Sequence, residues 1–191
     1  MLISQLENRK RLPPLTPEHI WHPGLDVEIA ALSEAELGDG LPDGYQSARA
    51  WKAALHLWND SLSAAHVLVE HLMTSTGSAL HGIIHRREGD YDNAKYWFHH
   101  AGDHPAFHSL QIRTTRFLRE QKISQGPLRD VFDKMSSQGS WNPYLFINAV
   151  AIQENYIDEG HPRGLLEHIQ HMELEALMRF IEGRIVVGNR S

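Results

Sequence analysis

The sequence predicts an all-α protein that forms a single-domain helical bundle. Hydrophobic residues recur at spacings of three and four over most of the chain, as they do on the buried face of a helix. Alternation of polar and apolar residues over the length of a strand is missing, apart from a possible short strand at 185–187. The length of 191 residues is that of one domain. We therefore expect a bundle of seven or eight helices.

The N-terminal residues 1–24 are expected to form a proline-rich arm that lies over the body in an extended conformation. They contain four prolines, and proline removes a backbone donor that the interior of a helix needs. The all-α domain is expected at 25–187, followed by a C-terminal tail at 188–191.

The longest predicted helix covers residues 46–73. Apolar residues from Trp51 to Leu72 form a helical stripe that keeps its phase across the polar segment 59–61. Asparagine, aspartate and serine in that segment favour helix caps, so a break into two helices is the alternative. We favour one continuous helix because the stripe continues beyond the polar residues.

Shorter helices are expected on either side of this long one. Glycine and proline mark several of their ends, and aspartate or asparagine marks some of their starts. The expected ranges are 25–37, 78–88, 91–101, 106–121, 127–135, 142–157 and 163–185.

Residues 78–105 resemble a single tetratricopeptide repeat, which is a helical hairpin with small and aromatic residues at fixed positions. The matching residues are Gly82, Gly89, Tyr91, Ala94, Phe98 and Ala101. No second copy lies 34 residues away in either direction, and a solenoid needs about three or more repeats. The resemblance therefore implies one TPR-like hairpin inside a helical domain that is not a solenoid.

The same stretch resembles a family of uncharacterised all-helical proteins. Their shared core reads His-Gly-Ile-x-His-Arg-Arg-Glu, then Asp, Asn-Ala-Lys and Tyr-Trp-Phe. This chain has the matching residues at 81–88, 90, 93–95 and 96–98, with a weaker similarity at 57–60 and 65–66. The resemblance implies that this stretch is the core that the family shares, and it implies no activity.

The 14 histidines are the unusual feature of the composition, and some of them indicate a metal site. His81, His85 and Glu88 are four and three residues apart, so they share one face of a helix. His66 and Glu70 lie on the preceding helix, which a short turn makes an antiparallel neighbour. We predict a divalent metal bound by His66, His81, His85 and Glu88. Zn, Fe, Mn and Ni are the ions that such ligands suit.

A small anionic ligand is the other occupant that this region could take. Arg86 and Arg87 could hold its charge or orient the neighbouring Glu88, because guanidinium groups bind carboxylates and phosphates in a fixed geometry. Asp60, Asn93 and Trp97 complete the predicted ligand-binding residues.

The sequence leaves open whether the protein is an enzyme. In a metalloenzyme, Glu70 or Glu88 would be the catalytic acid–base group for metal-assisted hydrolysis or non-haem iron chemistry. One alternative is a TPR-like interaction module without catalytic activity, with Trp97 in a peptide groove. The other is a metal-free structural network in which His81, His85 and Glu88 tie helices together.

A second histidine cluster lies on the last predicted helix. His168, His171 and Glu175 also share one face of that helix. We expect this face to be solvated, because the three residues point away from the apolar stripe.

The composition limits the partners and the compartment. The net charge is −6, and phosphate binding needs a basic face, so we expect no nucleic-acid partner. The absence of cysteine excludes disulfides and thiolate metal ligands. No apolar run approaches the roughly 20 residues of a membrane span. We expect a cytoplasmic protein that binds a metal ion or small molecule, and a homodimer is compatible with its five tryptophans.

Overall fold

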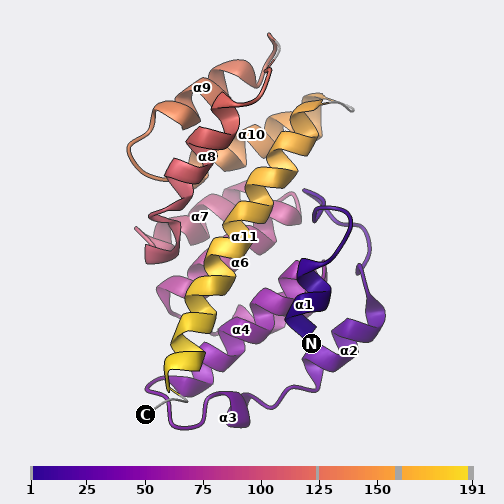
Figure 1. The fold of residues 1–191 in the computed structure, drawn as a ribbon, viewed down its shortest axis with the longest axis vertical. Helices are drawn as coiled ribbons and strands as arrows, with labels where there is room; N and C mark the ends of the chain where they lie inside the picture. Colours follow the sequence, from indigo (N-terminus) through magenta and orange to yellow (C-terminus); the bar gives the residue numbers. More distant parts are fainter. Residues whose placement is uncertain (1, 124, 158–160, 189–191) are drawn as a thin grey trace.

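The computed structural model describes residues 2–123, 125–157 and 161–188. Within these residues it contains eleven α-helices, one 3-10 helix and no strand, which confirms the predicted all-α class (Figure 1). The expected number of seven or eight helices is too low. The elements are α1 (Leu2–Glu7), α2 (Pro23–Ala30), α3 (Glu34–Leu37), α4 (Gly44–Trp58), α5 (Leu62–Val69), α6 (Ser75–Arg87), α7 (Tyr91–Ala101), η1 (Pro105–Phe107), α8 (Leu110–Arg119), α9 (Arg129–Ser137), α10 (Pro143–Tyr156) and α11 (His161–Gly188).

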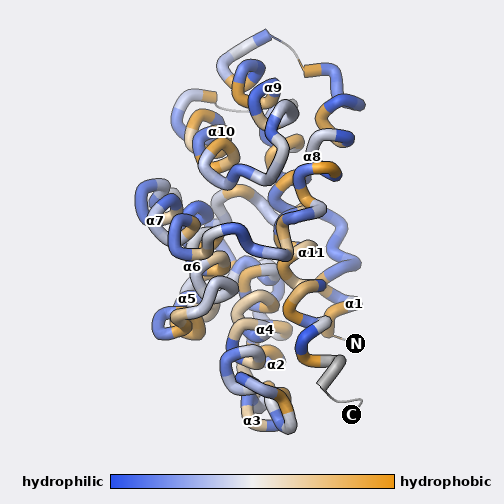
Figure 2. The backbone as a smooth tube through the Cα atoms, turned by 90° about the vertical axis from the view of Figure 1, so that its left-hand side faces the viewer, coloured by the Kyte–Doolittle hydropathy of each residue, from blue (hydrophilic) through white to orange (hydrophobic). Residues whose placement is uncertain are grey.

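The long helix α11 extends along most of the molecule and packs against α4, α8 and α10 (Figure 1). The helices α6 and α7 form the most extensive pair, and α5 contacts both α4 and α6. Hydrophobic and hydrophilic residues alternate along most helices, as amphipathic helices require (Figure 2). Their buried apolar side chains form one continuous core that reaches from Leu6 in α1 to Ile185 in α11.

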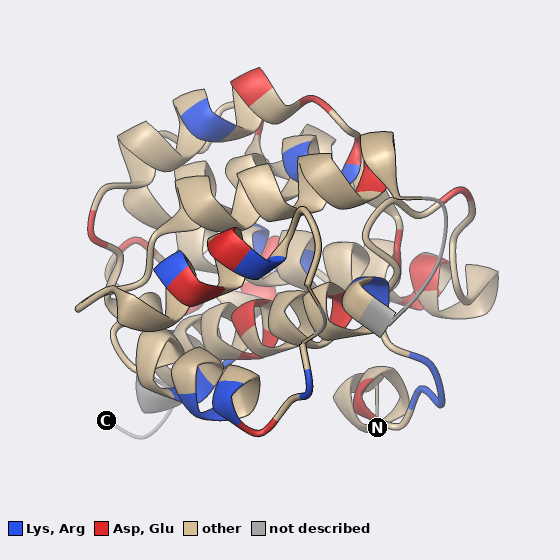
Figure 3. Ribbon diagram, turned by 90° about the horizontal axis from the view of Figure 1, so that it is seen from above, with Lys and Arg blue, Asp and Glu red and all other residues tan. Residues whose placement is uncertain are grey.

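Residues of both charges are distributed over the helices. Lys and Arg are interspersed with Asp and Glu over the helices seen in Figure 3. Among the described helices, none combines the length and the apolar character that crossing a membrane requires.

The predicted helix 46–73 is two helices, α4 and α5, so the expectation of one continuous helix is wrong. Asp60 lies between them with a φ of 62°, a left-handed conformation that interrupts an α-helix. The buried Asn59 is held by the N-terminal arm: its carbonyl oxygen accepts from Trp21 N at 3.0 Å and its Oδ1 accepts from His22 N at 3.1 Å. The polar segment thus makes tertiary contacts instead of continuing the helix.

Three further expected elements differ from the structure. The predicted helix 25–37 is divided into α2 and α3, because the Ser33 side chain accepts from Glu36 N and starts a new helix. The predicted helix 106–121 is replaced by η1 and the shorter α8. The possible strand at 185–187 is wrong, since these residues continue α11.

The N-terminal arm is not extended throughout. Residues 2–7 form α1, which packs its apolar side against α4, with Leu6 buried. The segment between α1 and α2 contains no helix, and its Leu15 is buried in the core. At the other end, α11 continues to Gly188, and the remaining residues of the predicted tail, 189–191, lie outside the described residues.

Candidate metal centre

The turn between α5 and α6 brings His66 close to the face of α6. Thr74 caps α6 by accepting a hydrogen bond from Gly77 N at 3.0 Å. A Cβ on Gly77 would lie only 2.1 Å from the carbonyl oxygen of Leu72, so only glycine permits so tight a turn. The start of α6 therefore packs directly against the end of α5.

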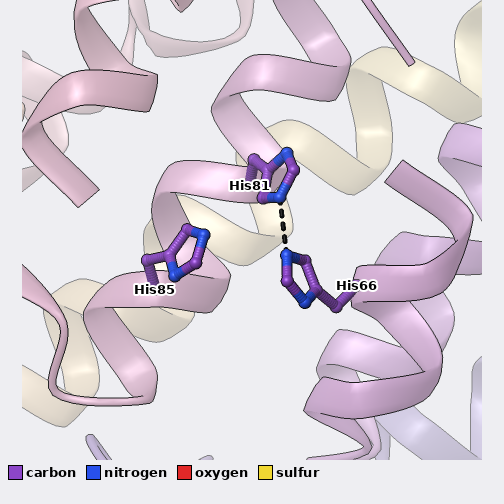
Figure 4. A group of neighbouring side chains, drawn as sticks. All are labelled: His66, His81 and His85. Atoms are coloured by element: carbon purple, nitrogen blue, oxygen red, sulfur yellow. Dashed lines mark hydrogen bonds between the residues drawn. The ribbon is translucent and has the colours of Figure 1, made fainter. Parts of the chain in front are cut away.

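Three imidazole rings meet between these helices, as Figure 4 shows. His66 on α5 points toward His81 and His85 on α6, and the Nε2 atoms of His66 and His81 are 2.7 Å apart. The rings of His81 and His85 are parallel within 6°, with centroids 5.2 Å apart. One nitrogen from each of the three rings lies within 4.8 Å of the others. These three residues can hold a metal ion.

Two buried ion pairs fix the rotation of α6 about its axis. Arg86 Nη2 lies 2.6 Å from a carboxylate oxygen of Glu173 on α11, and both side chains are fully buried. Arg87 Nη2 lies 2.5 Å from Asp60 Oδ1 in the break between α4 and α5. Burial lowers the pKa of Arg87 to about 10 against the opposing effect of Asp60, so the side chain stays charged at neutral pH. Both guanidinium groups therefore form ion pairs inside the core, and neither orients Glu88.

Burial keeps two of the histidines neutral at neutral pH. Desolvation, followed by the charges of the neighbouring rings of His66 and His85, lowers the pKa of His81 from 6.5 to about 4. Desolvation also lowers the pKa of His85, while the carboxylates of Glu88 and Asp90 oppose this shift. A neutral imidazole is the form that binds a metal. At neutral pH, His81 and His85 therefore need not release a proton before a metal binds.

Trp97 on α7 covers one side of the site. Its ring stacks on the ring of His81 with centroids 3.9 Å apart and planes inclined by 11°. The close approach of α7 depends on Gly82, because a Cβ there would lie 2.6 Å from the ring of Phe98. His81 Nδ1 is buried and has no hydrogen-bond partner in the described residues, so the stacked indole and the contact of Nε2 with His66 orient this ring.

Glu88 lies beside the three histidines rather than among them. One of its carboxylate oxygens is 3.1 Å from His85 Nδ1, and its side chain is 33% exposed. Glu70, the other predicted acid–base candidate, is exposed directly after the end of α5. The described group that could ligate a metal consists of histidines alone.

The remaining predicted ligand-binding residues have local or structural contacts. Asn93 is exposed and donates to the Asp90 carboxylate at 2.7 Å in the first turn of α7. Asp60 pairs with Arg87 and also with Arg9 of the N-terminal arm, at 2.8 Å. Trp97 is the member of this set that the structure places against a histidine of the candidate site.

Sequence reasoning missed the partners of the two arginines. Arg9 is 51 residues from Asp60, and Glu173 is 87 residues from Arg86. No local spacing links residues so far apart. The sequence offered one signal, the two adjacent arginines in an otherwise amphipathic helix. If other helices enclose such a helix, the buried arginines require buried carboxylates as partners.

The second histidine cluster is not the solvated face that we expected. His168 stacks on Phe117 with ring centroids 4.3 Å apart, and His171 meets the edge of Trp58 at 5.3 Å. Glu175 pairs with an arginine of α8. These residues contact side chains of α4 and α8, and all three are half-buried.

The chain was compared with protein families, curated proteins and solved structures. The chain matches no protein-family model, no curated protein and no solved structure.

Proposed function

We propose that this protein binds one divalent transition-metal ion through His66, His81 and His85. The observation that carries the proposal is the convergence of three imidazole nitrogens, from two neighbouring helices, within 4.8 Å. Burial supports it, because His81 and His85 are held in the neutral form that binds a metal. The ion pairs of Arg86 and Arg87 support it as well, because they fix the helix that carries two of the ligands.

The chemistry of the ligands favours zinc, copper, iron or nickel over manganese. Imidazole suits Zn, Cu, Fe and Ni, whereas Mn prefers oxygen ligands. Nitrogen ligands at about 2.0–2.1 Å from a tetrahedral ion are about 3.3 Å from each other. The Nε2 atoms of His66 and His81 are 2.7 Å apart, so binding moves these two rings slightly apart. Three protein ligands leave one position for water, where an ion could activate it for hydrolysis.

Elemental analysis of the desalted, tag-free protein tests the proposal. We expect about one transition-metal ion per chain, or its uptake when metal-free protein is titrated with Zn²⁺ in a calorimeter. The His85→Ala variant should lose this ion. The His108→Ala variant is the matched control, because the His108 side chain is 60% exposed and lies outside the group of three. Wild-type protein that neither retains nor takes up metal would contradict the proposal.

The 2.7 Å contact between His66 and His81 favours a second candidate, a metal-free structural network. One ring nitrogen then donates its proton to the other, and the pair ties α5 to α6. In that case the His66→Ala variant would lose about 1–3 kcal/mol of unfolding free energy, because it leaves a buried polar group unpaired. The wild type would take up no metal. The same titration therefore separates the two candidates.

A further inference from the structure

The contact between Glu88 and His85 differs from the contacts of the other two histidines. Glu88 ends α6, and its backbone N–H donates to the carbonyl of Ile84 at 2.9 Å. Gly89 follows with a φ of 81° and terminates the helix. The backbone of Glu88 is thus fixed, and its carboxylate reaches back one turn to within 3.1 Å of His85 Nδ1.

This contact selects the nitrogen that His85 offers to a metal. A neutral imidazole carries one proton, on either Nδ1 or Nε2. A carboxylate beside Nδ1 favours the proton on that atom, because the oxygen can only accept it. The lone pair is then left on Nε2, at the far end of the ring. Histidine ligands in metal sites commonly donate their other ring proton to a carboxylate in this way.

We propose that Glu88 is a positioning residue that sets the tautomer and ring orientation of His85 for metal binding and does not itself ligate the ion. This inference rests on the proposed metal site. The surroundings of the two rings differ, although the buried Nδ1 of each lacks a hydrogen-bond partner in the described residues. Trp97 and His66 contact the His81 ring. His85 Nδ1 instead has the Glu88 carboxylate 3.1 Å away, so a rotation of the Glu88 side chain would bring this pair into hydrogen-bond geometry.

The first test measures the tautomer in the metal-free protein. Nitrogen-15 NMR of the imidazole rings distinguishes a protonated Nδ1 from a protonated Nε2. We expect His85 to carry its proton on Nδ1 in the wild type and to shift toward Nε2 in the Glu88→Leu variant. A protonated Nε2 on His85 in the wild type would overturn the proposal. The Glu88→Gln variant keeps an accepting oxygen without the charge and should retain the Nδ1 proton.

The second test measures zinc affinity by competition with a chelating dye. Glu88→Leu should weaken binding about 10–100-fold, the usual effect of removing such a partner. Glu88→Gln should weaken it less. Asp92→Asn, which removes an exposed carboxylate from the first turn of α7, is the control and should leave the affinity unchanged. Equal zinc affinity in the wild type and Glu88→Leu would overturn the role of Glu88 but leave the proposed metal site standing. A wild type with no zinc affinity would overturn the metal site as well.

Discussion

A single residue without a side chain determines how closely α7 packs on α6. Gly82 faces the ring of Phe98, and a Cβ at this position would lie 2.6 Å from that ring. Trp97 precedes Phe98 on α7 and stacks on His81. The absence of one methyl group therefore permits the contact that orients a candidate metal ligand.

Replacing Gly82 by alanine should lower the unfolding free energy by about 1–3 kcal/mol, because the added methyl overpacks the α6–α7 interface. Urea denaturation measures this change. Gly164→Ala is the matched control, since Gly164 is an exposed position in α11 with open space around it. That variant should be neutral or stabilised by up to about 1 kcal/mol, because alanine favours a helix. Equal unfolding free energies for the two variants would contradict this prediction, because they would show that the Phe98 ring can move aside without loss of stability.

At the scale of the elements, the break between α4 and α5 has the largest consequence for the site. Asp60 sits in this break in a left-handed conformation and accepts from both Arg9 and Arg87. Because of the break, α5 runs in a different direction from α4, and His66 on α5 can face α6. The buried carboxylate thus connects the N-terminal arm, the break and the helix that carries His81 and His85.

Asp60→Asn should destabilise the protein by about 3–5 kcal/mol, because it leaves a buried arginine without its counter-charge. Asparagine tolerates the left-handed conformation, so the substitution removes the charge while keeping the backbone. The control is Asp133→Asn, which breaks the exposed pair of Asp133 with Arg129. Exposed pairs contribute about 0–1 kcal/mol. Equal urea midpoints for the two variants would contradict a structural role for the Asp60 pair.

On the scale of the whole molecule, several histidines are enclosed by the helices and are neutral in the folded state. His104 is one of them, outside the candidate site. It accepts from Ala106 N through Nδ1 and faces Thr76 Oγ1 through Nε2, at 3.0 Å. Burial, followed by the charges of Arg184 and His108, lowers its pKa from 6.5 to about 4.

The stability of the metal-free protein should fall as the pH is lowered from about 6.5 to about 4. Between these values the unfolded chain binds a proton at residue 104 that the folded chain does not bind, so acid favours unfolding. His104 alone should contribute on the order of 3 kcal/mol. In His104→Asn, which keeps an acceptor for Ala106 N, the unfolding free energy should depend less steeply on pH. Parallel pH profiles for variant and wild type, measured with EDTA present, would contradict this assignment.

Local patterns predicted the helical class and several elements well. The range predicted as 91–101 is that of α7, and α6, α9 and α10 lie within three residues of their predicted ends. Three of these helices, α6, α7 and α10, begin at a capping side chain close to them in sequence. The prediction failed at 59–61, where the stripe kept its phase while Asn59 and Asp60 bound the N-terminal arm. Sequence periodicity does not record contacts with a distant segment.

The sequence by itself determined that His81, His85 and Glu88 share one face of a helix, because spacings of three and four place residues together whatever surrounds them. Only the tertiary structure decided which partners meet that face. It placed His66 and Trp97 against His81 and directed Arg86 and Arg87 into ion pairs in the core. The physical reason is range: helical spacing is set by neighbouring residues, whereas a shared site and a buried ion pair depend on how separate helices pack.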